Sequence, residues 1–449
     1  MAKTTKKFIS VLSAIILALV SLTGLISASA QDVVAIDAAH FPDKSFRDVV
    51  LENFDLDSSG TLSDFEIAKV KDMQLFLYAD QIHDLTGIEY FTSLSQIYAG
   101  GLEIEKADFS ALSNLQKLYV QGNNLTSLDV SKNTALTDLV CSDNENLSSL
   151  ALSPSVTKLL CDGCALSSLD VSKCTNLAQL NCANSSLSSL DLSANAQLSD
   201  LNCSHNNIAA LDLSANPLLE NKVTSYNIGN QTIDAAAAFS GKTLLVPVSL
   251  SADKVVASSL PNENDEEGYT GYNGETSAFE FTDYSLIAAG IDYDYDVSCT
   301  GAQNLTVHIN LSKDFYKVSF NESQGGNVLD YSYVKSGGSV SAVQFPQASS
   351  GLVCPHWSAA AENITADTEI YAVWAASHSY EVQSYSNYVL TEKCSVCGDV
   401  HTADLKAAFN SKTGDSNYDS SLDADSNGYI NVRDHSILEI GRASCRERV

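Results

Sequence analysis

The sequence predicts a multidomain, β-rich protein built around a solenoid of parallel strands. Leucines recur every 20 or 21 residues through the middle of the chain, at Leu118, Leu139, Leu159, Leu180 and Leu201. A period this short indicates one small unit stacked on copies of itself, because a single unit cannot bury its own apolar face. Within a unit, Leu180 and Cys182 alternate with polar residues, which is typical of a short strand with one apolar side.

Composition restricts the possible partners. The 449 residues carry a formal net charge of −30, which argues against nucleic acid and anionic membrane surfaces as partners, because both require a basic patch. Divalent cations or a basic partner suit this charge, although exported proteins without any charged ligand often share it.

The N-terminus indicates export. Lys3, Lys6 and Lys7 precede the apolar stretch 8–26, and the small residues 28–30 suit a cleavage site. We therefore predict a signal peptide at 1–30, with an uncleaved anchor helix as the alternative. No other segment is apolar enough to span a bilayer, so we expect a secreted or cell-surface protein without a transmembrane segment after cleavage, and a monomer.

Residues 31–72 are predicted to form a helix, a loop and a second helix. The loop carries oxygens on alternate residues and Gly60 at its sharp turn, which suits Ca²⁺ because that ion takes about six to eight oxygen ligands. This pattern resembles an EF-hand. The expected ligands are Asp55, Asp57, Ser59, the carbonyl of Thr61, and Glu66. An acidic helix-capping loop that binds no metal is the alternative.

Repeats fill residues 73–222. Four of the 11 cysteines, Cys141, Cys161, Cys182 and Cys203, follow the repeat and are expected to stack as small buried residues. The tight turn after the strand carries Asn123, Asn144, Cys164, Ser185 or Asn206, and an inward asparagine there can satisfy buried backbone groups.

The unit Leu198-x-x-Leu201-x-Cys203-x-x-Asn206-x-Ile208 resembles the leucine-rich repeat family, and its return segment Leu-Asp-Leu-Ser-x-Asn resembles internalin-like short repeats. The resemblance implies a curved solenoid whose concave strand face binds a protein or a glycan. Exposed strand residues are the expected contacts, namely Tyr119, Asp138, Lys158, Gln179 and Asp200. A merely solvated face is the alternative.

Two β modules follow the repeats. Short apolar strands over 223–313 predict a β-sandwich-like domain. Residues 314–376 resemble the Listeria–Bacteroides repeat, a β-grasp-like spacer, through paired glycines at 325–326 and 337–338, Trp357, and the segment 371–374. Residues 377–403 form a linker in which Cys394 and Cys397 could bind zinc with His378 and His401. A disulfide or two free thiols fit that linker equally well.

Residues 404–438 hold a second acidic loop, with expected calcium ligands at Asp423, Asp425, Asn427, the carbonyl of Tyr429, and Asp434. This loop resembles half of a dockerin, which implies a short α-helical segment and calcium-dependent attachment to a cohesin-type scaffold. An isolated calcium loop is the alternative. Residues 439–449 resemble the translation of a sequencing-adapter oligonucleotide, so we leave them out of the fold and expect the natural sequence to continue beyond Leu438.

Sequence motifs of catalysis, such as H-E-x-x-H, G-x-S-x-G or a phosphate-binding glycine loop, are absent from the chain. The function expected from the sequence is therefore non-catalytic binding, with the solenoid recognising a protein or glycan and the dockerin-like loop attaching the molecule. An internalin-like adhesin is one alternative. The other is an enzyme whose catalytic domain lies in sequence that is missing here.

Overall fold

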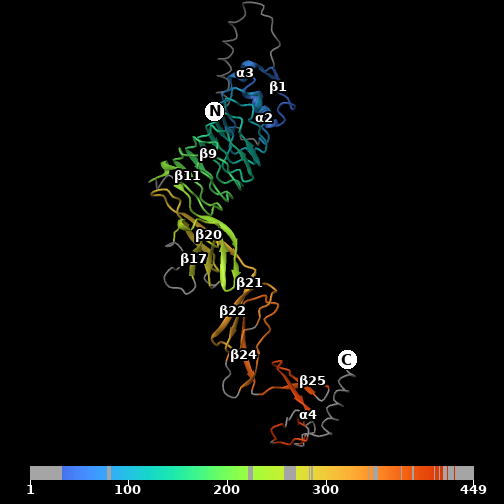
Figure 1. Cartoon of the computed structure of the whole chain (residues 1–449). Coiled ribbons are helices and arrows are strands. Elements are labelled where there is room, and N and C mark those ends of the chain that lie inside the picture. Colours follow the sequence, from blue (N-terminus) through green and yellow to red (C-terminus); the bar gives the residue numbers. More distant parts are fainter. Residues whose placement is uncertain are drawn as a thin grey trace, which may run out of the picture. The chain divides into compact units, whose positions relative to one another are not determined.

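The computed structural model describes residues 33–77, 82–220, 226–256, 269–282, 284, 287–341, 343–346, 352–375, 377–386, 389–408, 410–413, 415–417, 422 and 429. The described chain is rich in strands with few helices, as the sequence predicts (Figure 1). The described residues divide into two compact units, one within the ranges 1–234, 248–265 and 289–310 and the other within the ranges 235–247, 266–288 and 311–449. The predicted signal peptide, the calcium ligands Asp423, Asp425, Asn427 and Asp434, and residues 439–449 lie outside the described residues.

Two helices and a small sheet lie at the start of the described chain. Strand β1 (Val34–Ala35) precedes helix α2 (Lys44–Asn53) and pairs antiparallel with β2 (Thr61–Leu62), which comes directly before helix α3 (Asp64–Lys69). Helix α2 begins where the Asp43 side chain accepts a hydrogen bond from the Phe46 N–H at 2.9 Å. Helix α3 begins at a capping box between Ser63 and Glu66.

Aromatic rings join these helices to the first repeat. The Phe41 and Phe54 rings lie 6.4 and 5.4 Å from the ring of Phe91, measured between centroids. Gly87 has a φ of +105°, and a Cβ there would lie 2.3 Å from the Phe41 ring. The backbone at Gly87 therefore has to approach Phe41 without a side chain, and the apolar end of the solenoid is covered.

The solenoid sheet confirms the predicted repeat register. Its strands run parallel in chain order as β3 (Asp72–Gln74), β4 (Gln96–Tyr98), β5 (Lys117–Tyr119), β7 (Asp138–Val140), β9 (Lys158–Leu160), β10 (Gln179–Asn181), β11 (Asp200–Asn202) and β12 (Tyr226–Asn227) (Figure 1). The middle residues align as one buried spine, Met73, Ile97, Leu118, Leu139, Leu159, Leu180 and Leu201. On the return side, β6 (Ser127–Asp129) and β8 (Ser149–Ala151) form a second parallel pair.

Side-chain ladders bond each repeat to the one before it. The predicted turn asparagines are buried, and the Nδ2 of Asn206 donates to the carbonyls of Cys182 and Cys203 at 2.9 and 3.0 Å. The four repeat cysteines are buried as a ladder, and burial raises the pKa of Cys141, Cys161 and Cys182 well above the usual thiol value and that of Cys203 to about 12. These thiols are therefore protonated packing groups.

The ladder continues beyond residue 222. Gln231 takes the asparagine position, and its Nε2 donates to the Cys203 carbonyl at 2.8 Å while its Oε1 accepts from the Ile208 N–H at 3.1 Å. The Gln231 side chain thus bonds an N–H and a carbonyl of the preceding repeat, as Asn206 does one repeat earlier.

Two four-stranded sheets follow, and their strands alternate along the chain. One has the order β13 (Gln231–Ala236), β20 (Leu305–Ser312), β19 (Ile291–Tyr295), β16 (Val255–Val256) and lies largely in the solenoid's unit. The other has the order β14 (Ala238–Ser240), β15 (Thr243–Pro247), β18 (Ala278–Phe281), β17 (Tyr269–Asn273) and lies in the second unit. The strands predicted over 223–313 are thus shared between the two units.

The second unit contains two further sheets. A mixed sheet has the order β22 (Val328–Lys335), β21 (Phe315–Asn321), β24 (Thr368–Ala375), β23 (Val353–Trp357), in which β21 and β24 are parallel. The Trp357 ring packs on Phe320 at 5.0 Å, as expected of a residue at the core of this module. A three-stranded sheet, β25 (Tyr380–Ser386), β26 (Val389–Cys394) and β27 (Val400–Asp404), leads into helix α4 (Leu405–Ala408).

Short 3-10 helices occur at Leu75–Leu77, Ile88–Tyr90, Pro217–Leu219 and Ala252–Lys254. Among the described residues, none of the helices has the length and apolarity needed to cross a membrane.

Candidate functional site

The strand face of the solenoid carries two columns of side chains, formed by the residues directly before and directly after each spine residue in sequence. The first residues of the strands form the first column, Gln96, Lys117, Asp138, Lys158, Gln179 and Asp200. The third residues form the second column, Tyr98, Tyr119, Val140, Leu160, Asn181 and Asn202. Because successive side chains of a strand point to opposite faces of the sheet, both columns lie on the face that does not carry the buried spine. Four of the five predicted contacts share the first column, whereas Tyr119 belongs to the second.

The second column is aromatic and aliphatic over four successive strands. The rings of Tyr98 and Tyr119 stack with centroids 4.8 Å apart and an interplanar angle of 16°. That distance equals the spacing of neighbouring strands, so the sheet itself stacks the rings. Val140, which is only 8% exposed, and the half-buried Leu160 follow in the same column, and beyond them the column turns polar at Asn181.

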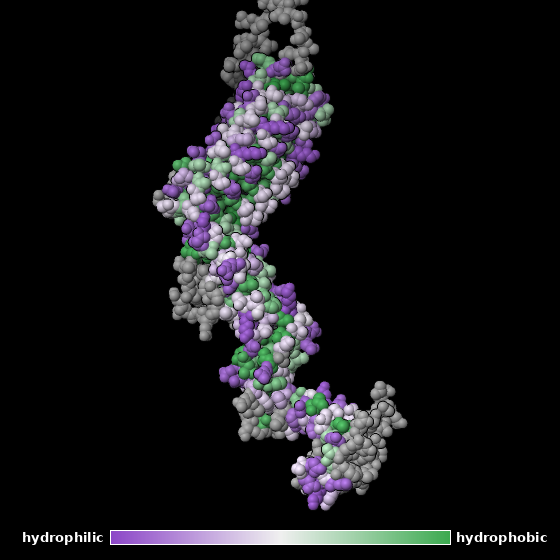
Figure 2. Space-filling view, in the orientation of Figure 1, coloured by the Kyte–Doolittle hydropathy of each residue, from purple (hydrophilic) through white to green (hydrophobic). Residues whose placement is uncertain are grey.

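Charges border this apolar surface. The Lys117 Nζ lies 3.8 Å from an Asp138 carboxylate oxygen, and the Gln179 Nε2 donates to Asp200 at 3.3 Å. Burial, and then the negative charge of Asp138, raise the pKa of Tyr119, so its hydroxyl remains a neutral hydrogen-bonding group. Figure 2 shows hydrophilic and hydrophobic residues interspersed over the visible face of the solenoid. Such a surface suits a partner that offers apolar contacts and polar groups together.

The predicted N-terminal calcium ligands lie together in the loop between α2 and α3. Carboxylate oxygens of Asp55, Asp57 and Glu66 all lie within 4.8 Å of one another. The Ser59 hydroxyl donates to the Thr61 carbonyl oxygen at 3.1 Å, and the Ser59 N–H donates to Asp55 and to Asp57 at 3.0 Å, so hydrogen bonds connect the other two predicted ligands to the same loop. Leu62 is fully buried, as expected of the apolar residue in such a loop.

The chemistry of this donor set fits a hard cation. Asp55 and Glu66 are only 8% and 3% exposed, and among the described residues no lysine or arginine forms an ion pair with either of them or with Asp57. Backbone N–H groups hold the carboxylates in place, as from Gly60 to Asp55 at 2.9 Å and from Leu56 to Glu66 at 2.6 Å. Buried carboxylates without a cationic partner are expensive to keep charged, and a bound Ca²⁺ would compensate them.

Hydrogen bonds favour the ionised form of Asp57 in this loop. The Ser59 side chain and backbone N–H lower the pKa of Asp57 below its usual value, so this carboxylate is ready to ligate a cation at neutral pH. Of the second predicted loop, the structure describes only Tyr429, which is 56% exposed and forms a β-bridge with Lys412.

The cysteine pair of the linker has one histidine beside it. The Nδ1 of His378 lies 3.3 Å from the Cys397 sulfur, whereas the Nδ1 of His401 lies 3.4 Å from a Glu392 carboxylate oxygen. The backbone N–H of Cys397 stabilises the Cys394 thiolate and lowers its pKa to about 5, against the opposing effect of burial. Of the two histidines considered from the sequence, the structure therefore brings His378 to the cysteines and pairs His401 elsewhere.

No protein-family model matches the chain, and no curated protein matches it. Solved structures of internalin-like proteins do. Internalin C2 from Listeria monocytogenes is similar over 46% of this chain and 90% of its own, at 19% identity and a TM-score of 0.32. The functional domain of InlJ from the same species, which includes a cysteine ladder, is similar over 63% of this chain and 100% of its own, at 17% identity and a TM-score of 0.19. Secreted internalin-like Lmo2445 is similar over 64% of this chain and 100% of its own, at 12% identity and a TM-score of 0.34.

Sequence reasoning missed three residues of the second column, Tyr98, Val140 and Leu160. The signal that identifies them is present in the repeat, because they follow the spine residue by one position just as Tyr119 follows Leu118. Applying that offset to every repeat would have separated the apolar column from the charged one.

Proposed function

We propose that this chain is an exported, non-catalytic binding protein whose solenoid strand face binds a partner protein. The observation that carries this proposal is the second column, where the half-buried Tyr98, Tyr119 and Leu160 lie in register on successive strands with the buried Val140, beside a column of polar and charged residues. Protein interfaces concentrate binding energy in aromatic and aliphatic anchors surrounded by polar groups, and this face has that composition.

Rigidity favours the same surface. The asparagine ladder fixes the backbone turns after β5, β7 and β11, so the backbone beside the anchors is ordered before any partner arrives. A pre-organised face loses less conformational entropy on binding than one carried on mobile loops. The strand face is therefore the part of the solenoid best suited to specific recognition.

The test is a binding screen in which the full-length protein is offered purified extracellular protein domains and, in parallel, immobilised glycans. We expect a protein hit whose affinity falls by more than about tenfold when Tyr98 and Tyr119 are both replaced by Ala, which corresponds to about 1.4 kcal/mol or more. Phe65→Ala is the matched control, because Phe65 is an aromatic residue that is 60% exposed and lies outside the strand face. Binding only to glycans, or equal loss in the control, would contradict the proposal.

The N-terminal loop is proposed to bind Ca²⁺ through Asp55, Asp57, Ser59, the carbonyl of Thr61, and Glu66. The gathered carboxylates and their lack of a cationic partner among the described residues support this role. The ion would supply positive charge that holds the loop closed. Because the Phe41 and Phe54 rings connect this cap to Phe91 of the first repeat, a closed loop would stabilise the end of the solenoid.

This proposal follows the adhesin hypothesis, in which the solenoid performs the recognition. Attachment to a cohesin-type scaffold stays a prediction, because four of its five calcium ligands lie outside the described residues. Cohesin pull-down of the chain in the presence and absence of Ca²⁺ tests that prediction separately from the strand-face screen.

A further inference from the structure

A tight turn brings two thiols and an imidazole together in the second unit. His378 precedes β25, Cys394 ends β26, and Cys397 lies in the turn before β27. Gly398 closes that turn with a φ of +75°, and its N–H donates to the Cys394 carbonyl at 3.0 Å. A side chain at Gly398 would make this left-handed backbone unfavourable, so the glycine enables the approach of the two cysteines.

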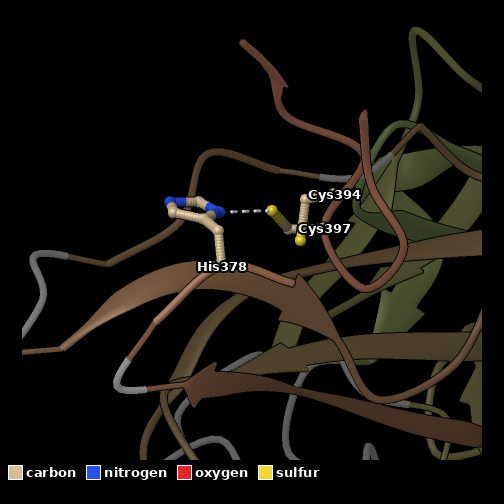
Figure 3. Close-up of side chains that lie close together, drawn as sticks. All are labelled: His378, Cys394 and Cys397. Carbon is tan, nitrogen blue, oxygen red and sulfur yellow. Dashed lines mark hydrogen bonds between the residues drawn. The ribbon is translucent and has the colours of Figure 1, made fainter. Parts of the chain in front are cut away.

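The three side chains converge on one point. Figure 3 shows the His378 ring directed toward the Cys397 sulfur, with the Cys394 sulfur beside it. One ligand atom from each residue lies within 4.8 Å of the other two. Ligands of a tetrahedral Zn²⁺ lie roughly 3.4–3.8 Å from one another, since the metal–ligand bonds are about 2.0–2.3 Å long. Small side-chain movements would therefore bring all three atoms to bonding distance.

A further contact holds the imidazole in this orientation. The Tyr380 ring stacks on His378 with centroids 5.1 Å apart, and the Tyr380 hydroxyl donates to an Asp399 carboxylate oxygen at 2.7 Å. This stacking restricts the orientation of the His378 ring.

We propose that His378, Cys394 and Cys397 bind a Zn²⁺ ion whose fourth ligand is a water molecule. Two thiolates and one imidazole form a soft donor set that selects zinc over calcium or magnesium, which prefer oxygen. His401, the other histidine near the pair in sequence, is not a ligand because it faces Glu392 instead.

The small sheet that carries these residues explains why a metal would be useful there. Among the described side chains of β25, β26 and β27, the buried apolar ones are Leu390, Cys394 and Ala403. A core this small contributes little stability, and small domains commonly depend on a metal or a disulfide instead. The proposed ion connects the start of β25 to the β26–β27 turn and so fastens all three strands.

The test uses the full-length protein, prepared with its thiols reduced, freed of metal with a chelator and then titrated with Zn²⁺ or Co²⁺. We expect a thiolate-to-cobalt charge-transfer band that Zn²⁺ abolishes. This band distinguishes the cluster from the oxygen ligands of the calcium loop, which cannot produce it. The substitutions His378→Ala, Cys394→Ser and Cys397→Ser should each weaken binding by more than about tenfold.

Two substitutions of the same residue types serve as controls. His401→Ala and Cys299→Ser should keep the band and the affinity, since neither residue belongs to the cluster. Absence of the band in the unsubstituted protein, its persistence at full strength in His378→Ala, or recovery of a Cys394–Cys397 disulfide from the reduced preparation would each overturn the proposal. Should the cysteine variants fail to fold, the band in the unsubstituted protein and its response to His378→Ala decide the question.

Discussion

The side-chain amide of Asn144 donates to the carbonyl oxygen of Val120, one repeat earlier, at 3.0 Å. The same nitrogen donates to the Cys141 carbonyl at 2.9 Å, and the Asn144 Oδ1 accepts from the Leu125 N–H at 3.1 Å. A single buried side chain thus satisfies backbone groups of two neighbouring repeats. Those backbone groups are buried away from water, so they need a side chain such as Asn144 as their hydrogen-bond partner.

Replacing Asn144 with Ala should destabilise the solenoid by about 2–4 kcal/mol, because buried donors and acceptors lose their partner. Urea denaturation followed by circular dichroism measures the effect. Asn124→Ala is the control, since Asn124 is exposed and its change should stay within about 0.5 kcal/mol. Equal effects of the two substitutions would show that the ladder contributes nothing measurable.

The opposite substitution should strengthen a weak point of the ladder. Ser185 stands where other repeats have asparagine, and its hydroxyl donates only a long hydrogen bond of 3.5 Å to the Ala183 carbonyl. Ser185→Asn should stabilise the protein by about 1 kcal/mol, because the longer amide can reach the previous repeat as Asn206 does. An unchanged or lower denaturation midpoint would mean that the turn at Ser185 cannot accommodate the ladder geometry.

Acid should weaken the return side of the solenoid. The Ser172 hydroxyl and N–H donate to Asp170 at 2.6 and 2.9 Å and lower the pKa of that carboxyl below 3.8, and Ser193 acts in the same way on Asp191. A carboxyl whose pKa is lower in the folded state contributes stability that is present above the unfolded pKa near 3.8. That contribution disappears as the pH falls through the folded pKa.

We therefore expect the melting temperature to fall with acidification below about pH 4, and to fall less steeply when Asp170 and Asp191 are both replaced by Asn. Ser172→Ala gives an intermediate case, because it removes the hydroxyl donor and keeps the carboxylate. Thermal melts between pH 7 and the acid transition measure the slope. An identical slope in the Asp→Asn double variant would refute the assignment.

Calcium should bind the N-terminal loop and stabilise the protein. Glu66→Gln should weaken the affinity measured by calorimetry more than about tenfold, because one ligating charge is lost while the amide can still cap α3. The melting temperature should rise with calcium in the unsubstituted protein and respond much less in the variant. Glu52→Gln, on the exposed side of α2, is the charge-matched control. Calcium heats that are the same in both variants would exclude the loop as the site.

The sequence predicted most of the contacts between neighbouring repeats. The spine from Ile97 to Leu201, the turn asparagines and the cysteine ladder all follow from one period, because stacked copies must place equivalent residues in contact. The same reasoning missed a second ladder on the return side. There the Nδ2 of Asn195 donates to the carbonyls of Val171 and Cys174 at 3.1 and 2.8 Å.

For the candidate sites, the sequence can predict which side chains lie close together where those side chains share one short loop. Asp55, Asp57 and Glu66 lie within 12 residues of one another, so the loop alone brings them together. The choice between His378 and His401 could not be made in this way. It depends on strand pairing, in which Tyr380 lies opposite Cys394 and Glu392 lies opposite His401.

By itself, the sequence determined the solenoid, its buried spine and the grouping of oxygens in the N-terminal loop, because periodic and local contacts are set by spacing along the chain. Only the tertiary structure decided that Tyr98, Tyr119, Val140 and Leu160 form one column, and that His378 joins Cys394 and Cys397. Those neighbours are distant in sequence, and the hydrogen-bond register between strands brings them side by side.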